Sequence, residues 1–344
     1  MTTQMPQSEQ IMKRVPKDPE HEYGATDVNA IPTNEPCIVV FGGERTVSRK
    51  DANYYASIFN RLFAAYDIAD IGIYSAYYPF TDTNRSSGRS KMFRLAQNIL
   101  KKRQEFTISA DNKYVRDLYN QVIFPRIVDK NNKRFPDDVT MNNIHRVMIF
   151  THCHGAAVVR AFQELMMDDM VKYGYDKRVI PQIMKQLLVV QHAPTAPIHN
   201  SMFNTVSFMS ASDTLMNFHN VFSKYASEHG EDMMPSYFSA GNFFAAYLFT
   251  YQMIAEHQIV GLVPDSEQDQ LTPDGATIMA AERNAIINGA KSMRSNSTAP
   301  LSAKQLIAPI SASDKIKPDF DELKQNGEWF MAIMRHDLQS QRSK

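Results

Sequence analysis

The sequence predicts an α/β protein with a mainly parallel sheet and helices on both faces, and three observations support this prediction. Short apolar runs, each the length of a buried strand, lie at 37–41, 71–77, 147–150, 187–191 and 206–209. Segments with apolar residues at helical spacing separate several of these runs. Turns of glycine or small polar residues follow the runs. A strand, a turn, a helix and a further strand in that order are typical of a parallel sheet.

The composition favours a globular protein. It argues against nucleic-acid binding and against a membrane-spanning segment. Hydrophobic residues make up 43% of the 344 residues, and 37 basic residues balance 37 acidic ones. Nucleic-acid binding would call for a basic excess. No stretch approaches the ~20 apolar residues that a membrane span needs.

The ends of the chain differ in composition from its middle. Residues 1–35 are polar and rich in proline, so we expect a flexible or surface-lying arm. The main domain is expected over 36–287, a linker or long loop over 288–318, and a C-terminal helix within 319–344. Residues 1–35 contain no apolar core of a Sec-type signal peptide, which predicts a cytoplasmic protein, although other export routes leave no readable mark.

Helices are expected between the strands. One follows Gly42-Gly43 and buries residues such as Phe59 and Phe63, and a helical insertion is expected over 81–140, with helices near 92–100 and 114–122. Residues 214–262 are apolar and aromatic, and we expect them to be mostly helical. The fold predicted from this order is a sheet with an insertion before its third strand and a long C-terminal extension.

The stretch 147–159 brings a strand directly onto a helix. Val147 to Phe150 read as a buried strand, and Val158, Val159 and Phe162 begin a helical pattern. Between them lies the turn Thr151-His152-Cys153-His154-Gly155. Such a sharp turn exposes one side chain, and the N–H groups that start the helix face whatever this side chain attacks.

This turn resembles the elbow G-x-S-x-G of the α/β-hydrolase superfamily. Gly155 matches the second glycine, whereas Thr151 replaces the first and Cys153 replaces the serine. A minority of that family, of the dienelactone-hydrolase kind, also uses cysteine. The resemblance covers about residues 36–262 and implies an α/β-hydrolase-like fold with Cys153 as nucleophile.

The family keeps its acid and its histidine after the nucleophile, in that order. Asp213 follows the predicted strand 206–209, so the resemblance makes it the acid. Among the later histidines we choose His229, which lies in a turn-like segment, and retain His257 as the alternative. In the oxyanion hole, the N–H of His154 would act together with an N–H from the turn that includes Gly43. Losing one such donor typically costs ~3 kcal/mol of transition-state stabilisation.

The resulting functional prediction is a hydrolase or acyltransferase without a cofactor, acting on a small-molecule or acyl substrate through an ester, thioester or amide bond. The first alternative is a non-catalytic scaffold of the same fold that binds a protein partner. In that case Cys153 is a small residue in a tight turn, and Asp213 caps the helix that follows.

Two further chemistries remain open. His152 and His154 form an H-x-H that resembles the first zinc ligands of metallo-β-lactamases and amidohydrolases, and His192 and His199 end or follow the next strand. Ala156 and Ala157 stand where the metallo-β-lactamase motif continues with Asp-His, so we assign no metal ligand. Gly42-Gly43 could cradle a phosphate, but the chain lacks both nucleotide-binding glycine motifs.

Overall fold

The computed structural model describes about half of the chain. The described residues are 10–14, 25–43, scattered positions between 49 and 70, 71–78, 108–152, 154–192, 194, 201–209, 237–239, 275–295, 298–308 and 310. The chain divides into two compact units. The first comprises Met1–Ser57, Asp70–Thr205 and Gly289–Pro300, and the second comprises Ile58–Ala69, Val206–Asn288 and Leu301–Lys344.

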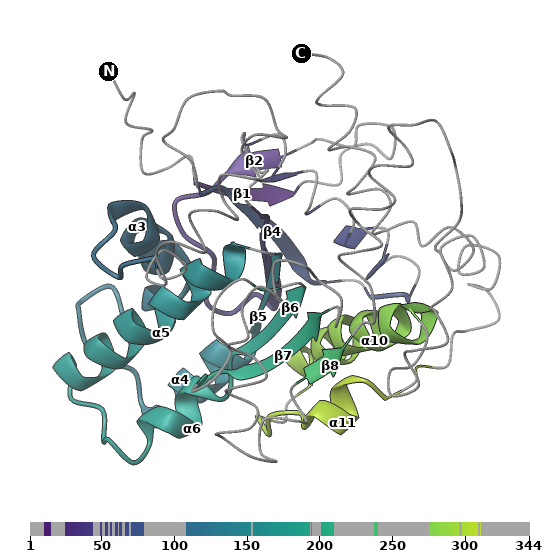
Figure 1. Cartoon of the computed structure of the whole chain (residues 1–344). Helices are drawn as coiled ribbons and strands as arrows, with labels where there is room; N and C mark the ends of the chain where they lie inside the picture. Colours follow the sequence, from purple (N-terminus) through teal and green to yellow (C-terminus); the bar gives the residue numbers. More distant parts are fainter. Residues whose placement is uncertain are drawn as a thin grey trace, which may run out of the picture. The chain divides into compact units, whose positions relative to one another are not determined.

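The first unit is built on a mixed, mostly parallel sheet, which confirms the predicted α/β class and mainly parallel sheet (Figure 1). Its strand order is β2-β1-β4-β3-β5-β6, with the start of β7 beside β6. The central strands β4, β3, β5 and β6 run parallel to their neighbours in that order. Their bounds are Gly72–Ala76, Cys37–Phe41, Val147–His152 and Leu188–His192.

The sequences of these strands suit a sheet that is covered on both faces. All five residues of β3 and of β4 are buried, as are the first five of β5. Parallel sheets of this kind read as continuous apolar runs because neither face meets water. In the second unit, β7 (Asn204–Met209) pairs in parallel with β8 (Tyr237–Ser239), a strand within the segment that was expected to be mostly helical.

The predicted N-terminal arm contributes two strands to the sheet. β1 (Ile11–Arg14) runs antiparallel to β4, and β2 (Ala25–Asp27) runs antiparallel to β1. Ile11 is fully buried. The described part of residues 1–35 therefore forms a sheet edge and differs from the expected flexible or surface-lying arm. The physical reason is that β4 would otherwise present unpaired backbone groups along a buried strand.

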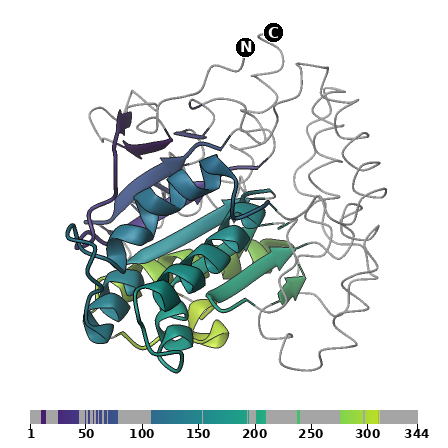
Figure 2. The same ribbon diagram turned by 90° about the vertical axis from the view of Figure 1, so that its left-hand side faces the viewer.

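Within the described part of the first unit, two helices precede β5 and two lie between β5 and β6. They are α3 (Lys113–Val122), α4 (Asp137–His145), α5 (Gly155–Lys172) and α6 (Ile180–Met184), with the short 3₁₀ helix η2 (Phe124–Arg126) after α3. Helices α3 and α5 lie side by side against the sheet (Figures 1 and 2). The side chain of Asn112 caps α3 by accepting hydrogen bonds from Tyr114 N and Val115 N.

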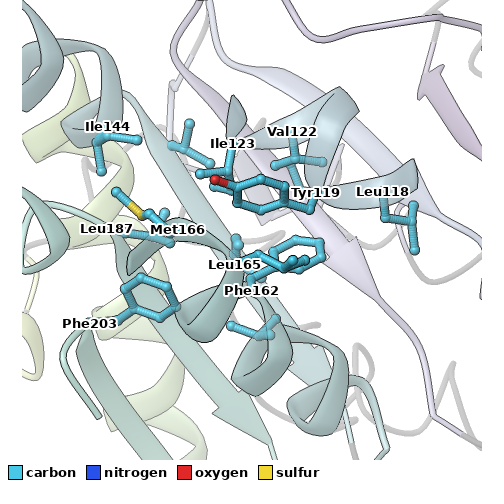
Figure 3. Close-up of a cluster of buried hydrophobic side chains, with 14 of the residues drawn as sticks. Leu118, Tyr119, Val122, Ile123, Ile144, Phe162, Leu165, Met166, Leu187 and Phe203 are labelled. Carbon is cyan, nitrogen blue, oxygen red and sulfur yellow. The ribbon is translucent and has the colours of Figure 1, made fainter. Parts of the chain in front are cut away.

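These helices bury one face of the sheet under a single apolar core (Figure 3). The ring of Phe162 on α5 meets Phe41 of β3 and Tyr119 of α3, each with ring centres 5.8 Å apart in an edge-to-face arrangement. Such aromatic pairs add about 0.5–1.5 kcal/mol each beyond the area that they bury. The other labelled residues of this core are Leu118, Val122, Ile123, Ile144, Leu165, Met166, Leu187 and Phe203.

The opposite face of the first unit's sheet is covered by the end of α10 (Gly275–Met293). A Cβ added at Gly289 would lie 2.4 Å from Leu188 Cδ2 and 3.0 Å from Met148 Sδ. Residues 288–318 were predicted as a linker or long loop, but they include these last turns and the short helix α11 (Ala303–Leu306). In the second unit, Asn288 Nδ2 donates to the carbonyl oxygens of Leu306 and Ala308, at 2.8 and 3.0 Å.

The structure describes one of four predicted helices in full and another in part, and the remaining two lie outside the described residues. The helix expected near 114–122 is α3, and described positions between 49 and 63 are helical, with Phe59 and Phe63 buried. The helices expected near 92–100 and within 319–344 lie outside the described residues. Of the helices that the structure describes, none has the length and apolar content required to cross a lipid bilayer.

Candidate functional site

The candidate site lies where β3, β5 and β6 end. In a parallel sheet the carboxyl ends of the strands share one edge, which is where open α/β sheets bind their ligands. β5 continues to His152, two residues further than predicted, and α5 begins at Gly155. The predicted passage from a strand through a very short turn to a helix is therefore present at this place in the chain.

Gly155 brings the start of α5 into contact with the end of β3. A Cβ at this position would lie 2.9 Å from Phe41 Cβ, 3.0 Å from Phe41 O and 3.1 Å from Gly42 O. Two of these three neighbours are backbone oxygens, which cannot rotate away as the tip of a side chain can. Only a residue without a Cβ fits there without displacing the backbone. The turn after β3 and the elbow after β5 are thus neighbours, as the resemblance implies.

Thr151 stands where the family's first elbow glycine would be, and its side chain is fully buried. It pairs in register with Phe41, so the two side chains point to the same face of the sheet. Thr151 Oγ1 has no hydrogen-bond partner among the described residues. A buried hydroxyl left in that state typically costs about 1–3 kcal/mol. The replacement of glycine by threonine therefore places a polar group at the base of the elbow.

His154 is the N-cap residue of α5 and has helical backbone angles, φ −62° and ψ −20°. Its carbonyl oxygen accepts the N–H of Ala157 at 3.0 Å. Burial lowers the pKa of the His154 imidazole from its ordinary 6.5 to about 4. The ring is consequently neutral at physiological pH, which suits its place near the positive end of a helix dipole.

His152 and His192 are the last residues of β5 and β6 and face each other in register. Their ring centres lie 5.3 Å apart and the ring planes are inclined by 56°. His192 is buried, with 3% of its surface exposed, whereas His152 is partly exposed. The sequence predicted His152 in the turn after one strand and His192 at the end of the next. Their contact follows from the pairing of β5 and β6, which extends to both residues.

Most of the predicted catalytic residues lie outside the described residues. These are Cys153, Asp213, His229 and the alternative His257. The two predicted oxyanion-hole residues are described: His154 at the start of α5, and Gly43 in a buried position just after β3. Phe41, Gly42 and Gly155 bring their segments together.

The histidines considered for a zinc site lie in different surroundings. No group of three or more histidine, cysteine, aspartate or glutamate side chains forms a metal centre within the described part of the chain. Of the histidines considered, His152 lies against His192, His154 belongs to the helix cap, and His199 is outside the described residues.

The other cysteine, Cys37, provides an internal contrast. It is fully buried at the opposite end of the sheet, and burial raises the pKa of its thiol from 9.0 to about 11. A thiol with such a pKa is almost entirely protonated at neutral pH and is a poor nucleophile.

Comparison with models of known protein families and with curated proteins gave no match to this chain.

Proposed function

We propose that this protein is a hydrolase or acyltransferase in which Cys153 attacks an ester, thioester or amide carbonyl. A thiolate at the start of a helix is favoured by the helix dipole. Its attack on the carbonyl carbon would break the bond to the alcohol, thiol or amine, which would leave with a proton from the histidine, and would give a thioester-linked acyl-enzyme. Water would then release an acid, or another nucleophile would accept the acyl group.

The observation that supports this proposal best is the close approach of Gly155 to the carbonyl oxygens of Phe41 and Gly42. An oxyanion hole of this class takes one N–H from the residue after the nucleophile and another from the loop after an earlier strand. Here those two segments belong to adjacent strands, β5 and β3, and contact each other. The proposed donors are the backbone N–H groups of His154 and Gly43.

The order of elements in the second unit bears on the proposed acid and histidine. Because β7 and β8 run parallel, the chain leaves both strands at the same end. Asp213 follows β7 and His257 follows β8, whereas His229 precedes β8. Both histidines lie outside the described residues. His229 therefore stays the first choice for the proton carrier that Asp213 would orient, with His257 as the alternative.

The first test compares the two cysteines of the folded protein. Iodoacetamide labelling over a range of pH, located by mass spectrometry, should give Cys153 a depressed pKa, while Cys37 should stay unlabelled below about pH 9. Equal reactivity, or none at either cysteine, would contradict an activated thiolate at the elbow.

The second test is catalytic. Cys153→Ala should lower the hydrolysis of activated esters and thioesters by more than about a thousandfold, and Cys37→Ala should not, provided that its melting curve shows a folded protein. A comparison of His257→Gln with His229→Gln identifies the proton carrier, since only one should lose activity. Full activity in Cys153→Ala would rule out Cys153 as the nucleophile. No activity in the unmodified protein would leave the non-catalytic scaffold, which the threonine in place of the first elbow glycine also favours.

A further inference from the structure

The second feature at the carboxyl edge of the sheet is the contact between His152 and His192, which the proposed hydrolase chemistry does not use. We propose that these two imidazoles form a binding site for one zinc-class divalent ion. The site rests on two described residues and does not depend on Cys153, Asp213 or His229 taking part in catalysis.

The backbone fixes the pair. β5 and β6 are adjacent parallel strands, and His152 and His192 are in register at their last positions. In-register residues of neighbouring strands point to the same face of a sheet, with their backbones about 4.8 Å apart. The pairing of five residues along these strands sets this arrangement, so neither loop needs to move to bring the rings together.

The separation of the rings suits a shared metal ion. Zinc binds imidazole nitrogen at about 2.0–2.1 Å with tetrahedral angles, so two imidazoles on one ion have ring centres roughly 5 Å apart. The centres of His152 and His192 lie 5.3 Å apart. The ring planes are inclined by 56°, so the two rings are not stacked in parallel.

Imidazole ligands select zinc, copper or nickel over the harder magnesium and calcium ions. Two protein ligands leave the remaining coordination positions to water or to a donor from a substrate. The H-x-H pair of His152 and His154 is less suitable, because His154 is the cap residue of α5 and the positive end of that helix repels a cation. We therefore expect His192, and not His154, to bind the ion together with His152.

The site can be tested with Zn²⁺ and Co²⁺ on the full-length protein. Zn²⁺ affinity is measured by competition with a chromophoric chelator, and Co²⁺ is added because its visible spectrum distinguishes tetrahedral from octahedral coordination. The variants are His152→Gln and His192→Gln. His145→Gln is the matched control, since His145 is buried and bonded to Ser292 O at 3.1 Å, at the other end of the sheet.

We expect one Zn²⁺ per chain in the unmodified protein. Each of the two variants should bind Zn²⁺ more than about a hundredfold less tightly, a larger loss than changes beyond the direct ligands usually cause. His145→Gln should bind as the unmodified protein does. Binding below one ion per chain in excess Zn²⁺, or equal affinity in His152→Gln, would overturn the proposal.

Two controls keep this result interpretable. His152 is partly exposed, so His152→Gln should remain folded even if His192→Gln does not, and urea unfolding of each variant verifies this. Zinc affinity is read out without any ester substrate. Loss of the metal site and loss of the proposed acyl chemistry are therefore separate outcomes.

Discussion

Two buried polar side chains at opposite ends of the first unit's parallel strands, Arg126 and Thr151, differ in their hydrogen bonding. At the amino end, the buried Arg126 donates all its N–H groups to protein acceptors. They are Val122 O (3.3 Å), Thr33 O (2.8 Å), Asn143 O (2.9 Å), Pro32 O (3.0 Å) and Cys37 Sγ (3.5 Å). At the carboxyl end, the Thr151 hydroxyl has no partner among the described residues, and two histidine rings lie against each other.

This difference marks Arg126 as a stabilising centre at the amino end. Arg126 joins the turn before β3, the last turn of α3 and the end of α4 through one guanidinium, because its planar fork matches several carbonyl groups at once. Nearby, Glu35 accepts hydrogen bonds from Lys13 Nζ at 2.6 Å and Tyr74 OH at 2.7 Å. At the carboxyl end, by contrast, the buried Thr151 hydroxyl has no such partner among the described residues.

The largest expected effect comes from breaking the amino end. Arg126→Met leaves several buried carbonyl groups without a donor, so we expect a loss of about 3–5 kcal/mol in the free energy of unfolding, measured in urea. Arg116→Met on α3 is the matched control, because its ion pair with Asp111 is exposed and should contribute less than about 0.5 kcal/mol. Similar losses in both variants would contradict the role given to Arg126.

A smaller effect is expected from crowding the carboxyl end. Gly155→Ala places a methyl group against the backbone oxygens of Phe41 and Gly42, and overpacking of this kind costs about 1–3 kcal/mol. It should also change the labelling rate of Cys153. In Gly289→Ala the nearest neighbour is the tip of the Leu188 side chain, so stability should fall without a change in that rate. An unchanged labelling rate of Cys153 in Gly155→Ala would mean that the reactivity of the elbow does not depend on its contact with the end of β3.

The smallest expected effect is pH-dependent and belongs to His154. Its folded-state pKa, about 4, lies below the ordinary 6.5, so the unfolded chain binds the extra proton first. Stability should therefore be unaffected by this residue above about pH 7 and should fall as the pH drops from 6.5 towards 4. We expect His154 to account for about 1–2 kcal/mol of that fall, less than the full pKa shift would give, because part of the residue's surface is exposed to solvent.

Urea unfolding at several pH values, with His154→Gln as comparison, measures this contribution. The variant should show a flatter dependence of stability on pH over that range. His145→Gln should flatten the curve in the same direction, since burial also lowers the pKa of His145. An identical slope in the unmodified protein and in His154→Gln would contradict the assigned pKa.

Local sequence predicted the central sheet well because its strands are short, apolar and closed by glycine or polar turns. The run Cys37–Phe41 is observed with its predicted bounds. β1 was missed because only Ile11 and Met12 in it are strongly apolar, and β4, its main partner, lies about sixty residues further along the chain. Such pairing depends on long-range contacts that no local pattern records.

In the candidate site, too, local features could be predicted from the sequence and long-range contacts could not. The elbow could be read from the strand, the turn and the helix, since all its signals lie within a dozen residues. The contact of Gly155 with Phe41 and the pairing of His152 with His192 require the strand order, which a single sequence does not state. The proposed roles of Cys153, Asp213, His229 and His257 stay predictions for the tests above.

The position of β1 has a practical consequence for anyone who shortens this chain. β1 covers the free side of β4, with Ile11, Met12 and Lys13 paired to Ala76, Ser75 and Tyr74. A truncation at residue 15 would uncover a buried strand with a row of unpaired N–H and C=O groups, which another molecule can extend by intermolecular pairing. Such a product is expected to aggregate even though every residue of the proposed site is still present.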